Sequence, residues 1–260
     1  MTYNHMIYSI EDRVAWITLN RPQKLNALNR PLWVEVQNAL RCADSNKDVS
    51  VIVLTGKGRA FCAGDDIEEL MNMRDPKAAQ ELFLGCIYGL VSTIFQIQKP
   101  LLSAVNGLAY GGGCELVLLT DIAIASENAK FAQPEARIGA WPPIFAIFGP
   151  GMVGIKATQE LLLGAEAIDA MRALEIGLVN RVVKIEKLKE STMEMAKNIM
   201  RCSPASIRII KETVLNVMGR NLYDFWIACQ RLVHEVAKTE DFSEGASAFL
   251  EKRSPRFRGV

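Results

Sequence analysis

The chain alternates short apolar segments with longer segments in which apolar residues recur at helical spacing. Apolar and polar residues partly alternate over Met6–Ile10 and Val14–Leu19, which predicts two strands. The fully apolar run at 51–54 predicts a strand that is buried on both faces, and the largely apolar run at 101–105 predicts another buried strand. Further strands are predicted at 122–125, 130–132 and 179–183, and helices at Leu32–Asp44, 67–73, 77–98, 114–119 and around 156–163. Because strand, turn and helix alternate, the predicted class is α/β.

The strand pattern ends near residue 186, and amphipathic helical patterns follow. Ser203 is a natural N-cap for a helix that begins at Pro204. The sequence therefore predicts an α/β core over 1–186 and an all-helical region over 187–260, which packs on its own core or on a neighbouring subunit. The predicted helices of this region are Lys187–Met200, Ser203–Met218, Leu222–Lys238 and Ser243–Leu250.

The charge and hydropathy of the chain argue against two classes of partner, nucleic acids and membranes. The 260 residues include 30 Lys+Arg and 29 Asp+Glu, so a formal net charge of +1 gives no field that would attract nucleic acid or an anionic membrane. The uncharged stretch Ile138–Ile155 is long enough for a membrane span, but Pro142, Pro143 and Pro150 interrupt it. We expect a buried loop and helix start there, or the wall of an apolar pocket, and no membrane association.

Histidine and cysteine usage excludes several chemistries. The two histidines, His5 and His234, are too few for a histidine-based triad or a multi-histidine metal site, so no metal is predicted. No CxxC pair occurs, and the N-terminus lacks the basic and apolar regions of a signal peptide. These features favour reduced thiols and a cytoplasmic location. The cysteines are Cys42, Cys62, Cys86, Cys114, Cys202 and Cys229.

Two glycine clusters, Gly58–Asp66 and Gly111–Glu115, directly follow predicted strands. Glycines allow close backbone approach to a ligand, and helix starts present unpaired N–H groups, so two facing turns could hold an oxygen that becomes negative during a reaction. Each cluster could equally be a structural turn. Neither matches a dinucleotide fingerprint or a phosphate-binding P-loop. Cys62 resembles the nucleophile of a nucleophile elbow, but a base is lacking, so a small buried thiol is expected.

Two glutamates could serve acid–base chemistry at these turns. Glu115 lies in the first turn of the predicted helix at 114–119, and Glu135 follows the short strand at 130–132. The strand at 122–125 would return the chain to the same end of the sheet. In an apolar setting the two carboxyls could differ in pKa, one acting as acid and one as base. The alternative is that Glu115 only complements a helix dipole and Glu135 lies on the surface.

The order of motifs along nearly the whole chain resembles the enoyl-CoA hydratase/isomerase (crotonase) superfamily. The resemblance implies a crotonase-like spiral of ββα turns, and it implies that the helices of 187–260 build homotrimers or hexamers (dimers of trimers). The motifs that carry it are Trp16–Pro22, Lys24–Leu28, Phe61–Ile67, Ala104–Gly107, Gly111–Glu115, Phe131–Glu135, Gly177–Asn180, Glu244–Gly245 and Phe249–Arg253.

The resemblance also implies an acyl-CoA thioester substrate and no separate cofactor. The oxyanion hole would consist of the backbone N–H groups of Asp65 and Gly112. Hydratases often have Ala where Asp65 stands, so its carboxylate is expected to point away from the enolate oxygen. The adenine end of coenzyme A would lie near Ala63, Asp65 and Ile67, and Lys24 and Lys252 would contact its phosphates. The full set of implied substrate and CoA contacts is Lys24, Ala63, Asp65, Asp66, Ile67, Gly112, Trp141, Phe249 and Lys252.

Because both acidic positions of the hydratases are filled, the implied reaction is addition of water across the 2,3 double bond of an enoyl-CoA, or its reversal. Glu115 would deprotonate the water, and Glu135 would exchange the proton at C2. The segment Gly139–Phe148 departs from the glycine-rich family pattern, and its aromatic residues Trp141, Phe145 and Phe148 either reshape the acyl pocket or fill the core. This departure keeps an isomerase, a thioester hydrolase and a decarboxylase as alternatives.

A non-catalytic RNA-binding or scaffold protein is the alternative from another class. The near-zero net charge argues against it. The basic residues within Lys252–Arg258 are explained more simply by contact with CoA phosphates or by a solvated surface.

Overall fold

The computed structural model describes residues 3–71, 82–217 and 238–258, and these residues form an α/β fold with two sheets. The larger sheet has six strands in the order β1-β2-β3-β5-β7-β10. β1 and β2 are antiparallel, and the other neighbours are parallel. Its strands are β1 (Met6–Glu11), β2 (Val14–Leu19), β3 (Val51–Gly56), β5 (Leu101–Val105), β7 (Ile122–Ser126) and β10 (Arg181–Val183).

The smaller sheet has the order β4-β6-β8-β9, and only its last pair is antiparallel. Its strands are β4 (Ala60–Cys62), β6 (Leu108–Tyr110), β8 (Lys130–Ala132) and β9 (Ile168–Asp169). A strand of the larger sheet is followed by one of the smaller sheet three times: β3 by β4, β5 by β6, and β7 by β8. The predicted spiral of ββα turns is therefore confirmed.

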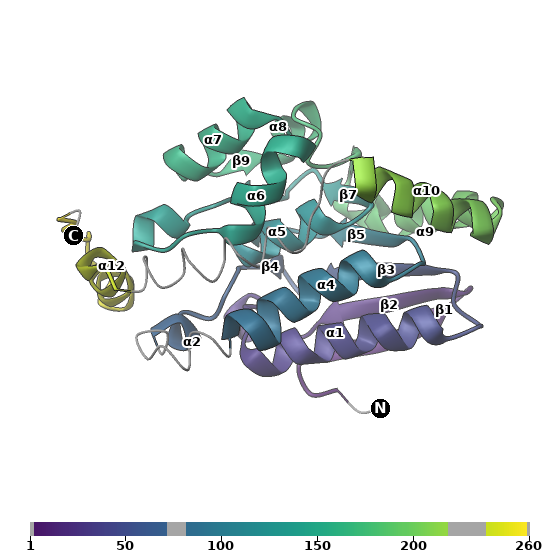
Figure 1. The fold of residues 1–260 in the computed structure, drawn as a ribbon, viewed down its shortest axis with the longest axis horizontal. Helices are drawn as coiled ribbons and strands as arrows, with labels where there is room; N and C mark the ends of the chain where they lie inside the picture. The colour runs from purple at the N-terminus through teal and green to yellow at the C-terminus, as the bar shows by residue number, and fades with distance from the viewer. Residues whose placement is uncertain (1–2, 72–81, 218–237, 259–260) are drawn as a thin grey trace.

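Helices cover both faces of the larger sheet. Residues of β2 alternate between two apolar clusters: Ile17 faces the cluster that contains Leu32 and Leu40 of α1 (Arg30–Ser45), whereas Trp16 faces the one that contains Met193 of α9 (Leu188–Met200). α4 (Gly89–Gln96) lies beside α1 (Figure 1). The prediction that the apolar runs are strands buried on both faces is confirmed.

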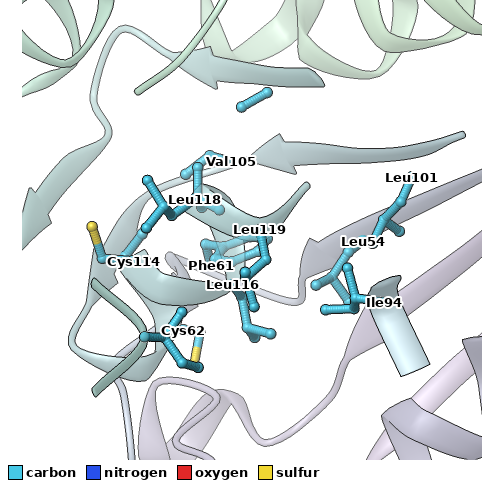
Figure 2. Close-up of a cluster of buried hydrophobic side chains, with 14 of the residues drawn as sticks. Leu54, Phe61, Cys62, Ile94, Leu101, Val105, Cys114, Leu116, Leu118 and Leu119 are labelled. Atoms are coloured by element: carbon cyan, nitrogen blue, oxygen red, sulfur yellow. The ribbon is translucent and has the colours of Figure 1, made fainter. Parts of the chain in front are cut away.

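The helix α5 (Gly112–Leu119) passes through the middle of the core, and all of its residues are buried. Figure 2 shows Leu116 and Leu119 of this helix among apolar side chains from several strands and from α4, with Phe61 and Leu54 close by. Close packing on all sides leaves the first turn of α5 little freedom to move, and this turn carries Glu115.

The uncharged stretch at 138–155 contains α6 (Pro143–Met152), and α7 (Ile155–Gly164) follows it. The expected helix start is thus present, at Pro143. Within the described residues, no helix combines the length and the apolar character that crossing a membrane requires.

Several short elements were not predicted. β4, β6, β9 and α8 (Ala170–Glu175) have between two and six residues, too few for a periodic pattern to be recognised. β10 begins at Arg181 rather than at 179. Part of the helix predicted at 77–98 is a π-helix, η3 (Leu82–Tyr88), where the Gln37 amide donates to the backbone oxygens of Gly85 and Cys86. Such side-chain insertion accounts for the irregular helical turn.

The C-terminal helices begin with η5 (Ile185–Lys187) and α9, followed by α10 (Pro204–Val217) and α12 (Glu240–Leu250). Ser203 Oγ accepts a hydrogen bond from the Ser206 N–H at 3.4 Å, as expected of an N-cap. The helix predicted at Leu222–Lys238 lies outside the described residues, apart from Lys238 itself. α12 packs against η4 (Glu135–Ile138) and lies at the same end of the molecule as α2 (Ile67–Met71) (Figure 1).

Candidate active site

The two glycine turns that the sequence singles out lie against each other. They follow β4 and β6, which are parallel neighbours, so both turns lie at the same edge of the smaller sheet. A Cβ atom on Gly64, whose φ is +93°, would stand 3.4 Å from the Gly112 nitrogen. The Leu28 N–H donates to the Gly64 oxygen, and the Asp66 N–H donates to the Leu28 oxygen. These bonds fix the first turn, and the two turns face each other as a shared oxygen site would require.

Different features orient the two N–H groups assigned to the oxyanion hole: the bonds to Leu28 orient that of Asp65, and the start of α5 orients that of Gly112. Because the Gly64 oxygen and the Asp66 N–H both face Leu28, the N–H of Asp65 between them points to the opposite side of this extended segment. Gly112 is the first residue of α5, so its N–H has no acceptor within the helix. The Gly112 N–H is thus without an acceptor in its own helix, whereas the Asp65 N–H also interacts with the carboxyl of Asp65 and favours its ionised form.

The carboxyl group of Asp65 lies between Trp33 and the second glycine turn, and its orientation away from an enolate oxygen stays a prediction. Its Oδ1 accepts a hydrogen bond from Trp33 Nε1 at 3.0 Å. Its Oδ2 lies 3.2 Å from the position that a Cβ atom on Gly112 would occupy. Burial raises the pKa of Asp65 to about 6, although the bond from Trp33 opposes this rise. The buried indole N–H of Trp33 needs an acceptor, and satisfying it draws the carboxyl inward.

Glu115 is buried in the first turn of α5, with 4% of its surface exposed. Its Oε1 accepts a hydrogen bond from the backbone N–H of Phe145 in α6 at 2.9 Å. Burial raises the pKa of Glu115 to about 8; the Phe145 N–H acts in the opposite direction, and the nearby Asp65 carboxyl adds to the rise. The carboxyl is therefore held in place from a second helix.

Glu135, the first residue of η4, approaches the same glycine turn from the other side. Its Oε1 lies 2.6 Å from the position that a Cβ atom on Gly111 would occupy, and Gly111 has a φ of +50°. Burial, followed by the proximity of Glu115, raises the pKa of Glu135 well above its usual value. Its Oε2 is buried and has no hydrogen-bond partner in the described part of the chain. The interpretation of the two glutamates as a helix-dipole residue and a surface residue is therefore not supported.

The surroundings of the two glutamates favour different protonation states, with Glu115 as the base and Glu135 as the acid. The Phe145 N–H favours the ionised form of Glu115. Glu135 lacks such a donor at Oε2 and lies near the charge of Glu115, which favours its protonated form, although its own backbone N–H acts in the opposite direction. The arrangement can offer one base and one acid to a molecule bound at the glycine turn.

The aromatic residues of the segment after Glu135 divide between the two expected roles. Phe145 and Phe148 have buried side chains within the core, and the Phe148 ring packs edge-on against Phe95 at a centroid distance of 5.3 Å. These two side chains therefore fill the core, although the backbone N–H of Phe145 also donates a hydrogen bond to Glu115. Trp141 is half-buried and packs against the same core. Its role in the acyl pocket stays a prediction.

The residues predicted to bind coenzyme A lie in two groups. Ala63, Asp66 and Ile67 lie along the first glycine turn and the start of α2, and Lys24 reaches this region because its Nζ lies 3.1 Å from Glu68 Oε1. Asp66 is buried and forms an ion pair with Arg21 at 2.9 Å. Phe249 and Lys252 are exposed at the end of α12. Their contacts with coenzyme A stay predictions.

Sequence reasoning did not identify Trp33, Arg21 or the backbone N–H of Phe145 as parts of this site. The position of Trp33 fits the apolar face of α1, and no local pattern shows that its N–H meets Asp65. Cys62 is fully buried, and burial raises the pKa of its thiol to about 12. The expectation of a small buried thiol is confirmed.

Comparisons with known proteins agree with this geometry. Residues 9–260 match the sequence pattern of a family described as enoyl-CoA hydratase/isomerase. A probable enoyl-CoA hydratase of Mycobacterium bovis is 36% identical over 264 residues, which cover 99% of each chain. The crystal structure of a carnitinyl-CoA hydratase from Mycobacterium avium is 31% identical, with a TM-score of 0.86 and full coverage of both chains. A methylmalonyl-CoA decarboxylase is 30% identical, again with a TM-score of 0.86 and full coverage of both.

Proposed function

The chain belongs to the enoyl-CoA hydratase/isomerase family, and we propose that it is a hydratase that adds water across the 2,3 double bond of an enoyl-CoA thioester, or removes it. The observation that carries this proposal is the approach of two glutamates to one glycine turn, the buried Glu115 from α5 and the half-buried Glu135 from η4. Their opposed environments supply the base and the acid that hydration requires.

In the hydration direction, Glu115 accepts a proton from water as the water oxygen bonds to C3. Glu135 delivers its proton to C2, and solvent later returns the proton from Glu115 to Glu135. Between these events, negative charge on the thioester oxygen is stabilised by the N–H groups of Asp65 and Gly112. Each such donor lowers the barrier by about 3 kcal/mol in a water-excluded site.

The fold by itself does not select this reaction, because a methylmalonyl-CoA decarboxylase shares it. A double-bond isomerase needs one group that moves a proton between two carbons, whereas hydration needs a second group for water. The presence of both Glu115 and Glu135 favours the hydratase over the isomerase, hydrolase and decarboxylase alternatives.

The assembly and location follow from the same proposal. We propose a homotrimer or a hexamer built through 187–260, where α10 exposes Ile209, Ile210 and Val214. We propose a cytoplasmic enzyme, since the described cysteines are free thiols. Acyl-CoA is the proposed partner, and neither nucleic acid nor membrane is part of the proposal.

The first test follows the ultraviolet absorbance of the enoyl thioester with crotonyl-CoA and with longer, branched and ring-containing enoyl-CoAs. Hydration of any of these, reduced at least about a hundredfold by Glu135→Gln, supports the proposal. The control is Glu127→Gln, at an exposed position outside the proposed assembly region. Tight binding of the thioesters without hydration would contradict it and favour an isomerase or a hydrolase.

A second measurement separates the two roles. In D₂O, exchange of a C2 proton of a saturated acyl-CoA for deuterium requires only the residue that transfers the proton at C2. Glu115→Gln should suppress hydration at least about a hundredfold while C2 exchange continues, whereas Glu135→Gln should suppress both. Loss of C2 exchange in Glu115→Gln but not in Glu135→Gln would reverse the assignment.

A further inference from the structure

The helix α12 meets η4, the short helix that begins with Glu135, backbone against backbone. A Cβ atom on Gly245 of α12 would stand 2.2 Å from the carbonyl carbon of Ile138, the last residue of η4. On the other side of the contact, a Cβ atom on Gly139 would stand 2.4 Å from the carbonyl oxygen of Asp241. Neither position has room for a side chain, so the two segments can lie this close only because both residues are glycine.

Other contacts hold α12 in its place. The Phe242 side chain, in the first turn of the helix, is buried in the main apolar cluster. Thr239 is the N-cap, and its Oγ1 accepts a hydrogen bond from the Phe242 N–H at 3.1 Å. Beyond the end of the helix, Arg253 Nη2 donates to Glu244 Oε2 at 2.9 Å. α12 is therefore a fixed surface against which η4 rests.

The contact with α12 lies within one helical turn of Glu135. The Gly139 N–H donates to the carbonyl oxygen of Glu135, and the Ala140 N–H donates to the same oxygen at 2.9 Å. The residues that touch α12 are thus tied to the backbone of Glu135. Its side chain reaches the second glycine turn, where Oε1 lies 2.6 Å from the Cβ position of Gly111. A shift of η4 at α12 would therefore move this carboxyl relative to the turn.

The two glutamates differ in how their carboxyls are held. Oε1 of Glu115 accepts the Phe145 N–H at 2.9 Å, which fixes that carboxyl from α6. Oε2 of Glu135 is buried and has no hydrogen-bond partner among the described residues. The place of the Glu135 carboxyl therefore depends on where the backbone of η4 lies, whereas the place of the Glu115 carboxyl does not.

We propose that Gly245 is a positioning residue for Glu135. By admitting the backbone of Ile138 against α12, it sets the position of η4 and hence the reach of the Glu135 carboxyl toward C2 of a bound thioester. This inference rests on the proposed role of Glu135 in proton transfer at C2. Gly245 itself touches no reacting atom, and its effect passes through Glu135 alone.

Gly245→Ala tests the inference through C2 exchange, the reaction assigned to Glu135. The new methyl group would push the backbone of Ile138 away, so deuterium exchange at C2 of butyryl-CoA should fall about a hundredfold, the scale expected when a catalytic group moves by about 1 Å. The same loss should appear in the Glu115→Gln background. In the Glu135→Gln background, Gly245→Ala should change the residual hydration of crotonyl-CoA by less than about twofold, because the group through which it acts is gone.

Gly164→Ala is the matched control and should change neither rate, since no atom lies within 4 Å of its Cβ position. A merely structural role of Gly245 predicts a different pattern, in which Gly245→Ala lowers hydration by the same factor in wild type and in Glu135→Gln. That pattern, or unchanged C2 exchange in folded Gly245→Ala, would overturn the inference.

A second variant decides the matter if thermal unfolding shows that Gly245→Ala does not fold. Phe242→Leu loosens the anchoring of α12 in the core without placing an atom against η4. It should lower C2 exchange at least about threefold and leave the residual hydration of Glu135→Gln unchanged. A lowered Tm with unchanged C2 exchange would overturn the inference.

These outcomes separate the inference from the proposed function. If the wild type exchanges C2 protons but hydrates no enoyl-CoA, the hydratase proposal fails, and the effect of Gly245→Ala on exchange still decides the role of Gly245. If hydration occurs and its loss in Gly245→Ala is the same with and without Glu135, only the inference fails. If the wild type catalyses neither reaction, both fail.

Discussion

The backbone N–H of Phe145 donates a hydrogen bond to Oε1 of Glu115 across 2.9 Å, which joins the start of α6 to the first turn of α5. This bond lies in the segment Gly139–Phe148, where the sequence departs from the glycine-rich pattern of hydratases. The residues that differ from this pattern therefore still provide a hydrogen-bond donor for Glu115. The donor lies in a helix that begins at Pro143, and the proline ring suits the first helical turn.

The buried Glu115 should make the stability of the protein depend on pH. Its pKa is about 8 in the folded chain against an ordinary value of 4.5. Its protonated form therefore stabilises the fold fully below pH 4.5, and this contribution is lost as pH rises through 8. Glu115→Gln cannot ionise, so its free energy of unfolding relative to wild type should rise by at least about 1 kcal/mol between pH 5 and pH 8.

Urea unfolding at these two pH values measures this change. Glu127→Gln, an exposed substitution between β7 and β8, serves as the control and should show no such trend. A constant difference between Glu115→Gln and wild type across the range would contradict the raised pKa.

Gly111→Ala should disrupt the site. The new Cβ would lie 2.6 Å from Glu135 Oε1, and the φ of +50° is unfavourable for a residue with a side chain. We expect Glu135 to be displaced and hydration to fall at least about a hundredfold, since positioned acid–base groups contribute on that scale. Gly164→Ala at the end of α7 is the matched control, because no atom lies within 4 Å of its Cβ position. Equal activity in the two variants would refute the close approach of Glu135.

Trp141→Ala should change which acyl chains the enzyme accepts. The side chain is half-buried beside the core and belongs to the segment that follows η4. Removing it should raise kcat/KM for longer or branched enoyl-CoAs relative to crotonyl-CoA by about tenfold, the scale of one or two methylene contacts. The measurement is the ratio of kcat/KM values across the panel, with the exposed Leu163→Ala as control. An unchanged ratio would exclude Trp141 from the acyl pocket.

Lys24→Ala should weaken binding of coenzyme A through its phosphates. The side chain is exposed and already pairs with Glu68, so it lies beside the start of α2. If it contacts the 3′-phosphate, Lys24→Ala should raise the Kd of CoA about tenfold at low salt and leave the Kd of 3′-dephospho-CoA unchanged. Lys187→Ala is the matched control, because Lys187 is also exposed and paired with a glutamate. Equal loss of affinity for both ligands would show that Lys24 does not contact this phosphate.

The larger sheet was predictable from the sequence because its signals are local. The apolar runs that became β3 and β5 are long enough to indicate strands buried on both faces, and the pattern at 6–19 indicates β1 and β2. β4 and β6, with three residues each, were not predicted. Their identity as strands depends on pairing with each other across residues far apart in the chain, which no local pattern records.

The sequence by itself determined the α/β class, the two glycine turns and the two glutamates, because each of these follows from neighbouring residues or from ordered motifs. Only the tertiary structure decided how the carboxyls are oriented and charged. Trp33 lies 32 residues before Asp65, and Phe145 lies 30 residues after Glu115. Packing brings these N–H donors to the carboxyls and removes water from around them. Hydrogen bonding and desolvation together set the position and pKa of a buried acid, and both depend on residues that are distant in sequence.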